Sequence, residues 1–299
     1  MRFVCDRPHS RGLATAACEW EQKFVIRASA GRGATVGAMS RQRIDALLAE
    51  QGKFGSRTAA AAAVRAGEVR VGSDGPFALR PSQLVEPDAD LIIAEGKRYV
   101  SRGGVKLANA LESLRVEVSG RDCLDVGAST GGFTDCLLQH GADRVAALDV
   151  GHGELDWGLR NDPRVTVIER RNARSLQPSD LPFLPSLATV DVSFISLAKV
   201  LPAVAVTLGE GGELLALVKP QFELGPERVG KGGVVRDRGA RRDALRGVAQ
   251  TAGPLGLALR GFASSGLPGP KGNRETFVWL ARGGESIVDI DAAIQEVER

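Results

Sequence analysis

The chain has 299 residues, of which 43% are hydrophobic and 25% charged, and its formal net charge is +3. These values are typical of a globular protein with room for about two domains, and they are compatible with a polyanionic partner. No run approaches the roughly 20 apolar residues that span a bilayer, which argues against a membrane span. The four cysteines show no Cys-x-x-Cys spacing, which argues against structural zinc and a disulfide framework. This use of cysteine favours a reducing, cytoplasmic location.

The first 39 residues show no clear secondary-structure pattern and no apolar core of the length that a secretory signal needs. Helical patterning begins directly after Met39. We expect residues 1–39 to be a disordered tail or an upstream extension of a protein that starts at Met39. A basic transit peptide is the alternative.

Residues 40–96 are predicted to form a small α+β domain. One helix is ended by Gly52, and a second lies between a Ser56 cap and Gly67. Short strands are expected at 69–71 and 91–93. Six cations of this segment could bind the phosphates of a nucleic acid; a solvated charged face is the alternative. They are Arg41, Arg43, Lys53, Arg57, Arg65 and Arg70.

Residues 97–103 are predicted to be a linker to a larger domain, residues 104–284, in which helices and strands alternate. Helices are expected at 104–115, 132–140, 153–160, 197–207 and 237–253, and strands at 122–126, 144–149, 164–168, up to Asp191, 213–218, 257–263 and 275–281. This alternation predicts an α/β fold with a doubly wound, mostly parallel, Rossmann-like sheet, whose ligand lies beyond the carboxyl ends of the strands. Residues 285–299 are expected to be a helical tail.

The segment from Asp125 to Thr134 joins an apolar strand to a helix through three glycines. Glycines allow a ligand to approach the backbone, and the helix start directs free N–H groups at it. A dinucleotide fingerprint would need glycine in place of Ser129, whereas a carboxylate at Asp125 suits the ammonium of S-adenosylmethionine. An ordinary glycine-rich turn is the alternative. The candidate cofactor ligands are Asp125, Gly127, Ala128, Ser129, Gly131, Gly132 and Phe133.

Two polar residues follow the next strands. Asp149 ends the second strand, where an acid can bind the hydroxyls of an adenosine ribose in both nicotinamide and S-adenosylmethionine sites. Asn172, after the third strand, is a candidate for reading the adenine edge. Both could instead cap local turns.

Four charged residues are expected to gather at the same sheet edge: Lys106, Asp191, Lys219 and Glu275. A ribose 2′-hydroxyl is a weak nucleophile that must lose its proton as it attacks. A partly desolvated lysine can take that proton while carboxylates orient the lysines. The cluster therefore suits methyl transfer to a ribose hydroxyl, with Asp191 also adjoining the cofactor. Simple pairing of each lysine with a phosphate or carboxylate is the alternative.

Several sequence blocks between residues 41 and 281 resemble the TlyA family, the haemolysin-like ribosomal RNA ribose 2′-O-methyltransferases. These proteins join an αL-type RNA-binding domain to an FtsJ-like methyltransferase domain. The blocks are 43–48, 56–57, 65–71, 99–107, 125–134, 155–157, 191–197, 217–223, 230–237 and 269–273.

The resemblance implies S-adenosylmethionine as cofactor and a cytidine in ribosomal RNA as substrate, sometimes in both subunits. It assigns catalysis to Lys106, Asp191, Lys219 and Glu275, with Lys219 helping to activate the hydroxyl. We expect a monomer without metal or membrane contact. The alternatives are a membrane-lytic haemolysin and a catalytically inactive, RNA-binding ribosome-assembly factor.

Overall fold

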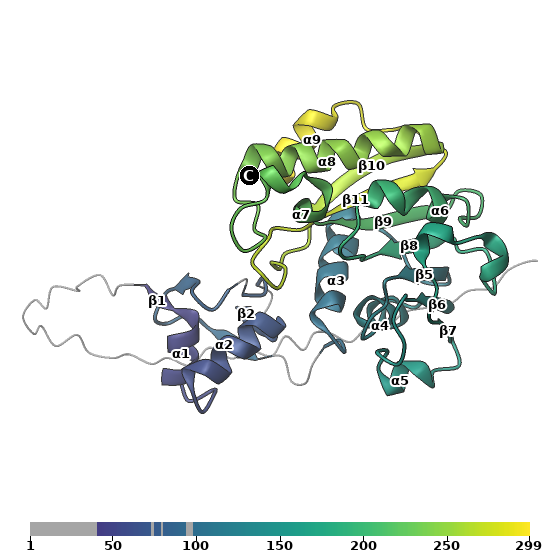
Figure 1. Ribbon diagram of the computed structural model, residues 1–299. Helices are drawn as coiled ribbons and strands as arrows, with labels where there is room; N and C mark the ends of the chain where they lie inside the picture. The colour runs from purple at the N-terminus through teal and green to yellow at the C-terminus, as the bar shows by residue number, and fades with distance from the viewer. Residues whose placement is uncertain (1–40, 73–74, 79, 94–97) are drawn as a thin grey trace, which may run out of the picture. The chain divides into compact units, whose positions relative to one another are not determined.

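A computed structural model describes residues 41–72, 75–78, 80–93 and 98–299 (Figure 1). The predicted extension 1–39 lies outside the described residues, as does the side chain of Arg65. The part from residue 98 onward is built on a seven-stranded sheet with the order β10-β11-β9-β8-β5-β6-β7. Its strands are β5 (Asp122–Val126), β6 (Arg144–Leu148), β7 (Val165–Ile168), β8 (Leu187–Val190), β9 (Glu213–Val218), β10 (Leu257–Ser264) and β11 (Thr276–Arg282).

The predicted mostly parallel, doubly wound sheet is confirmed. Strands β5 to β9 run parallel, and β11 enters antiparallel between β9 and β10. The buried strands are continuous apolar runs because helices cover both faces. Successive residues of β5 point to opposite layers: Cys123 packs with α3 (Arg102–Leu114) and α4 (Gly132–Gln139), and Leu124 packs with α6 (Leu201–Ala205) and α8 (Arg238–Ala252).

Three predicted helices differ in their bounds. Helix α3 begins inside the predicted linker because the Ser101 hydroxyl caps it, accepting from the Gly103 N–H at 3.2 Å. Helix α5 (Trp157–Arg160) is shorter than predicted because Gly153, at φ +76°, is not helical and Asp156 caps the helix start. The predicted helix 197–207 is a 3₁₀ turn followed by the short α6, with a proline in its first turn.

The tail ends in a helix, α9 (Ile290–Val297), which packs on α8 and β10. Between them, a buried ion pair of 2.7 Å joins Arg241 of α8 to Glu298 directly after α9. The short helix α7 (Pro220–Glu223) follows β9 at once. No helix in the described part of the chain is both long and apolar enough to cross a membrane.

The N-terminal part contains the two predicted helices, α1 (Ile44–Glu50) and α2 (Arg57–Ala66), and the predicted strands β2 (Val69–Val71) and β4 (Leu91–Ile93). A further pair, β1 (Gln42–Arg43) with β3 (Leu84–Val85), was not predicted because two-residue strands show no periodicity. Alanines of α2 pack with Ile44, Leu48 and Leu91 in the core of this part. Its alanine run therefore has a packing role.

Candidate active site

Three neighbouring strands bring the predicted catalytic residues to one edge of the sheet. Asp191 follows β8, and Lys219 follows β9, its parallel neighbour. Because β11 runs antiparallel to β9 and pairs Thr276 with Val218, the residue before β11, Glu275, reaches the same edge as Lys219. The fourth residue, Lys106, comes from α3, which packs on one face of this sheet.

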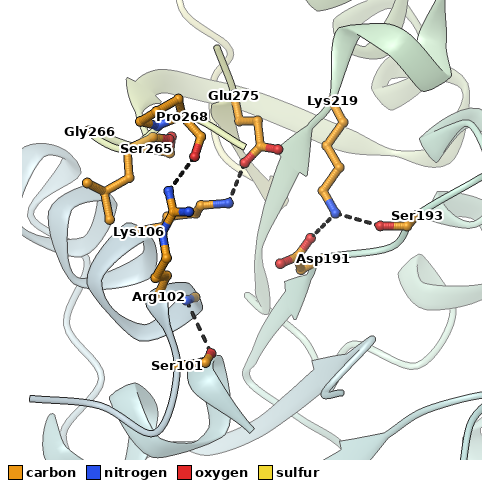
Figure 2. A network of polar contacts seen from close by, with 12 residues as sticks. Ser101, Arg102, Lys106, Asp191, Ser193, Lys219, Ser265, Gly266, Pro268 and Glu275 are labelled. Carbon is orange, nitrogen blue, oxygen red and sulfur yellow. Dashed lines mark hydrogen bonds and ion pairs between the residues drawn. The ribbon is translucent and has the colours of Figure 1, made fainter. Parts of the chain in front are cut away.

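The four charges form two separate ion pairs (Figure 2). Lys106 Nζ lies 2.5 Å from Glu275 Oε2, and both side chains are less than 10% exposed. Lys219 Nζ lies 2.5 Å from Asp191 Oδ1 and also donates to Ser193 Oγ at 2.9 Å. The structure thus brings each lysine to a different acid, a pairing that sequence spacing could not predict.

The Lys106–Glu275 pair belongs to a larger junction between α3 and the segment before β11. One turn before Lys106, Arg102 donates to the Pro268 carbonyl at 2.6 Å, and one turn after it Asn109 donates to the Ser265 carbonyl at 3.0 Å. Positions three and four apart share one helix face. This face of α3 therefore holds the segment that ends in Glu275.

The glycine-rich loop has the backbone geometry that the sequence predicted. Gly127 and Gly131 have φ of +87° and +96°, and Ser129 itself has φ +48°. A Cβ on Gly127 would lie 2.4 Å from the carbonyl oxygen of Asp191. Only glycine fits this position, so the loop and the backbone of Asp191 are in direct contact.

Asp125 lies beneath this loop, with no exposed surface, which differs from the predicted contact with a ligand. Its carboxyl accepts from the Thr134 hydroxyl at 2.7 Å and from the Thr189 hydroxyl at 3.3 Å. Burial raises the pKa of Asp125 to about 7, and the nearby charge of Asp191 acts in the same direction. Asp125 thus connects α4 to β8 underneath the site.

Three other predicted ligands also have packing roles. Phe133 is buried and stacks near Phe277, with ring centroids 5.7 Å apart, and Ala128 belongs to the same core. A Cβ on Gly132 would lie 2.1 Å from Ser101 Oγ. Their side-chain positions serve the contact between α4 and the rest of the domain.

Asp149 stands at the end of β6, as predicted. Its two carboxylate oxygens accept from the N–H groups of Ser129 at 2.8 Å and of Gly151 at 2.7 Å. Each oxygen retains a second lone pair that a ribose hydroxyl could use. Glu154 receives the Ser129 hydroxyl at 3.2 Å, so two acids surround this loop residue.

A cleft of about 540 Å³ opens above these strand ends. Its lining includes Gly127, Ser129, Asp149, Asn172, Asp191 and Phe194. The size is within the range of small-molecule and cofactor sites. Asn172 caps a 3₁₀ turn by accepting from Arg174 N–H at 3.0 Å, so the predicted adenine reader also has the local role that was its alternative.

Three residues near the site were not singled out from the sequence. Ser193 accepts a hydrogen bond from Lys219, and Glu223 accepts from the Ser196 hydroxyl and the Leu197 N–H. Phe194 is 91% exposed, and its backbone has a φ of +63°. A bulky residue with positive φ is uncommon and marks a constrained loop. The sequence signals were their places shortly after Asp191 and Lys219, within the blocks 191–197 and 217–223 that resemble the family.

The buried cysteines do not take part. Burial raises the pKa values of Cys123 and Cys136 to about 12, so both stay as thiols at neutral pH. Residues 41–72, 75–78, 80–93 and 98–299 contain no cluster of three or more His, Cys, Asp or Glu side chains that could hold a metal ion.

Most of the predicted RNA-binding cations have protein partners. Buried Asp45 pairs with Arg43 at 2.7 Å and Arg57 at 3.3 Å, and the hydrogen bond from Arg43 lowers the pKa of Asp45. Arg41 pairs with Glu86 at 2.6 Å. Lys53 donates to the Leu91 carbonyl, and the Arg70 guanidinium lies 4.4 Å from the Phe77 ring centroid.

Comparisons with known proteins show the family of the chain. The family of FtsJ-like methyltransferases matches residues 99–282. The 16S/23S rRNA (cytidine-2′-O)-methyltransferase TlyA of Mycobacterium tuberculosis is 48% identical over 242 residues, which are 80% of this chain and 90% of the relative. Hemolysin A of Brachyspira hyodysenteriae is 38% identical over 78% of this chain and 97% of its own length.

A solved structure agrees as well. A Streptococcus thermophilus protein described as a hemolysin superimposes with a TM-score of 0.66 at 41% identity, over 87% of this chain and 95% of the other. Sequence and fold thus match over most of both chains. The chain belongs to the TlyA family of FtsJ-like methyltransferases.

Proposed function

We propose that this protein transfers a methyl group from S-adenosylmethionine to the ribose 2′-hydroxyl of a cytidine in ribosomal RNA. The observation that carries the proposal is the Lys219–Asp191 pair, 2.5 Å apart, at the edge of a cleft that the glycine-rich loop also lines. The named activity of the M. tuberculosis relative supports the same substrate class.

The residues of the cleft suit S-adenosylmethionine. Asp149 offers its carboxylate to the ribose hydroxyls, and the backbone at Gly127 is open to close approach. Asp191 lines the same cleft and pairs with the catalytic lysine, so a methyl group held there lies next to that lysine. S-adenosylmethionine supplies the methyl group as an electrophile on a positively charged sulfur.

Lys219 acts on the hydroxyl of the substrate. Lys219 would first give up its own proton to solvent, and its Nζ would then accept the 2′-hydroxyl proton as the oxygen attacks the methyl carbon. The carbon–sulfur bond would break, and S-adenosylhomocysteine would leave. Asp191 then stabilises the ammonium that Lys219 has become, and Ser193 accepts one of its N–H groups. Holding oxygen, carbon and sulfur in line accounts for much of the remaining rate.

Phe194 is proposed to hold the target base. Its ring is almost fully exposed beside the cleft and is supported from one side by Phe222, at a centroid distance of 5.2 Å. An exposed ring of this kind offers a stacking platform, and base–aromatic stacking contributes about 1–3 kcal/mol. An enzyme that acts on a ribose inside structured RNA needs such a hold on the displaced nucleotide.

We further propose that residues 40–96 are an RNA-binding domain, followed by a linker and the methyltransferase domain. The basic residues around Asp45 support this, since a buried acid that fixes two arginines leaves their outer N–H groups available to phosphates. A ribosomal substrate would place the protein in the cytoplasm.

The test is methylation of ribosomal subunits from cells that lack this modification. The protein is incubated with labelled S-adenosylmethionine and each subunit, and the product is mapped by nuclease digestion and mass spectrometry. A 2′-O-methylcytidine at one or a few positions is expected. Label on a base, or no label in either subunit, would contradict the proposal.

The haemolysin names of some relatives raise a second possibility, membrane lysis. A leakage assay on dye-loaded vesicles, with protein shown to be active in methylation, separates the two. We expect no leakage.

A further inference from the structure

Residues 219–223, which are Lys219 and the one-turn helix α7, contact the loop after β8 at three successive places. We define residues 191–196 as the target loop, because it carries Asp191, Ser193 and Phe194. Directly before α7, Lys219 holds Asp191 and Ser193. Within α7, the ring of Phe222 packs on that of Phe194.

The third contact closes the far end of the target loop. Glu223 Oε2 accepts from the Ser196 hydroxyl at 2.6 Å, and Oε1 accepts from the Leu197 N–H at 2.9 Å. Both carboxylate oxygens are used, and they bind residues 26 and 27 positions away in the sequence. Charge-assisted hydrogen bonds of this type are stronger and shorter than neutral ones.

The setting of Glu223 makes these bonds its main support. Among the described residues no ion pair is found for it. Burial raises the pKa of Glu223, while its two donors favour the charged form. A half-buried carboxylate with only these two donors is costly to keep unless the geometry that it enforces matters.

We propose that Glu223 is a positioning residue that fixes the target loop relative to Lys219. This inference rests on the proposed function, in which the target loop presents Asp191, Ser193 and Phe194 to the RNA. The strained φ of Phe194, +63°, needs such support at both ends of the loop, since the neighbouring structure must over-determine it. Glu223 touches neither cofactor nor reacting atoms and acts through the loop.

The experiment compares Glu223→Ala and Glu223→Gln in the full chain. Glutamine keeps the shape without the charge: its oxygen can accept from the Leu197 N–H and its NH₂ group can donate to the Ser196 hydroxyl oxygen. We expect kcat with ribosomal RNA to fall about 10- to 100-fold for alanine and about 3- to 10-fold for glutamine, because small misplacements of reacting groups cost rate. The Kd for S-adenosylmethionine should change much less than kcat, because the glycine-rich loop and the residues after β6 and β7 also line the cleft, in addition to the target loop.

A matched control removes a carboxylate cap elsewhere. Asp289 caps α9 by accepting from Ala292 N–H at 2.8 Å, so Asp289→Ala loses the same kind of bond. It should leave kcat unchanged. An unchanged kcat in folded Glu223→Ala, or in Glu223→Gln if the alanine variant does not fold, would overturn the proposal. An equal loss of kcat and of cofactor affinity would do the same.

A measurement without RNA separates this proposal from the enzymatic one. Amide hydrogen exchange at Leu197 should be faster in Glu223→Ala than in the unmodified protein, because the N–H loses its acceptor. Equal exchange at Leu197 would overturn the positioning role of Glu223 even if methylation is confirmed. If exchange is faster in the variant but the unmodified protein methylates no RNA, the contact between Glu223 and the target loop is supported and the enzymatic proposal is rejected.

Discussion

The two lysine–carboxylate pairs have the same chemistry and the same 2.5 Å separation, but they lie in different surroundings. The two lysines are similarly buried, but Glu275 is 1% exposed between α3 and the start of β11, whereas Asp191 is 23% exposed and lines the cleft. A sealed pair cannot exchange protons readily with a substrate. We therefore propose that the Lys106–Glu275 pair mainly holds the site together and that the Lys219–Asp191 pair takes part in the reaction.

The largest effect on rate is expected at the exposed pair. Lys219→Ala removes the proton acceptor, and Lys219→Arg keeps the positive charge but cannot be deprotonated at neutral pH. Both should lower kcat by about 10³-fold or more, with cofactor affinity and unfolding midpoint nearly unchanged. Retained activity in the arginine variant would show that charge alone suffices. Lys199→Ala, at an exposed lysine, is the control.

The sealed pair should instead report on folding. Removing one partner of a buried pair leaves an uncompensated charge, so Glu275→Ala should lower the free energy of unfolding by about 3–5 kcal/mol. The double variant Lys106→Met/Glu275→Leu should recover much of the lost free energy of unfolding, which chemical denaturation measures for both variants. It should remain inactive in the methylation assay if the pair also orients the substrate.

A control for the sealed pair is the other buried pair, Arg241–Glu298. Glu298→Ala should cost a comparable amount of stability but leave kcat unchanged at temperatures where the protein is folded. If Glu275→Ala and Glu298→Ala had identical effects on both quantities, the Lys106–Glu275 pair would have no part in catalysis.

Asp125 gives a pH-dependent effect beneath the site. An unfolded Asp ionises near pH 4, whereas burial raises the pKa of Asp125 in the folded protein to about 7. Between these values the folded state binds more protons, so stability falls as pH rises. Asp125→Asn removes this loss and should gain on the order of 2 kcal/mol relative to the unmodified protein between pH 4.5 and 8. Parallel stability curves of the two proteins would contradict the buried, protonated Asp125.

The smallest effect is expected at Ser193. Ser193→Ala removes one hydrogen bond that orients Lys219 and should lower kcat about 3- to 10-fold, in line with about 1 kcal/mol for such a bond. In the Lys219→Ala background the same change should have no further effect, because the two residues act as one unit. Additive losses would mean that Ser193 acts on the substrate independently.

The sequence predicted the strand ends well and the partners poorly. Asp191 and Lys219 could be placed because alternating helices and strands fix which ends share an edge. Which acid meets which lysine depends on β11 entering between β9 and β10, and no local pattern encodes that order. Glu275 was placed at this edge by its position before the last strand, but its contact with Lys106 was not predicted.

Burial was the second quantity that local sequence could not give. Asp125 looked like a ligand at a strand tip, but Thr189, 64 positions away, helps to cover it. Arg41 was predicted to be available for RNA, but it donates to the carboxylate of Glu86, which lies 45 positions further along the chain. Glu223 was missed for the same reason, since its partners belong to another loop.

The place of β11 in the sheet also sets when activity can begin. Lys106 and Glu275 are 169 positions apart, and the strand that carries Glu275 to the edge lies inside the sheet between β9 and β10. During synthesis, a chain that has only reached the end of α8 holds the glycine-rich loop and Lys219 but neither of the last two strands. We therefore expect the site to be complete only when almost the whole chain has been synthesised.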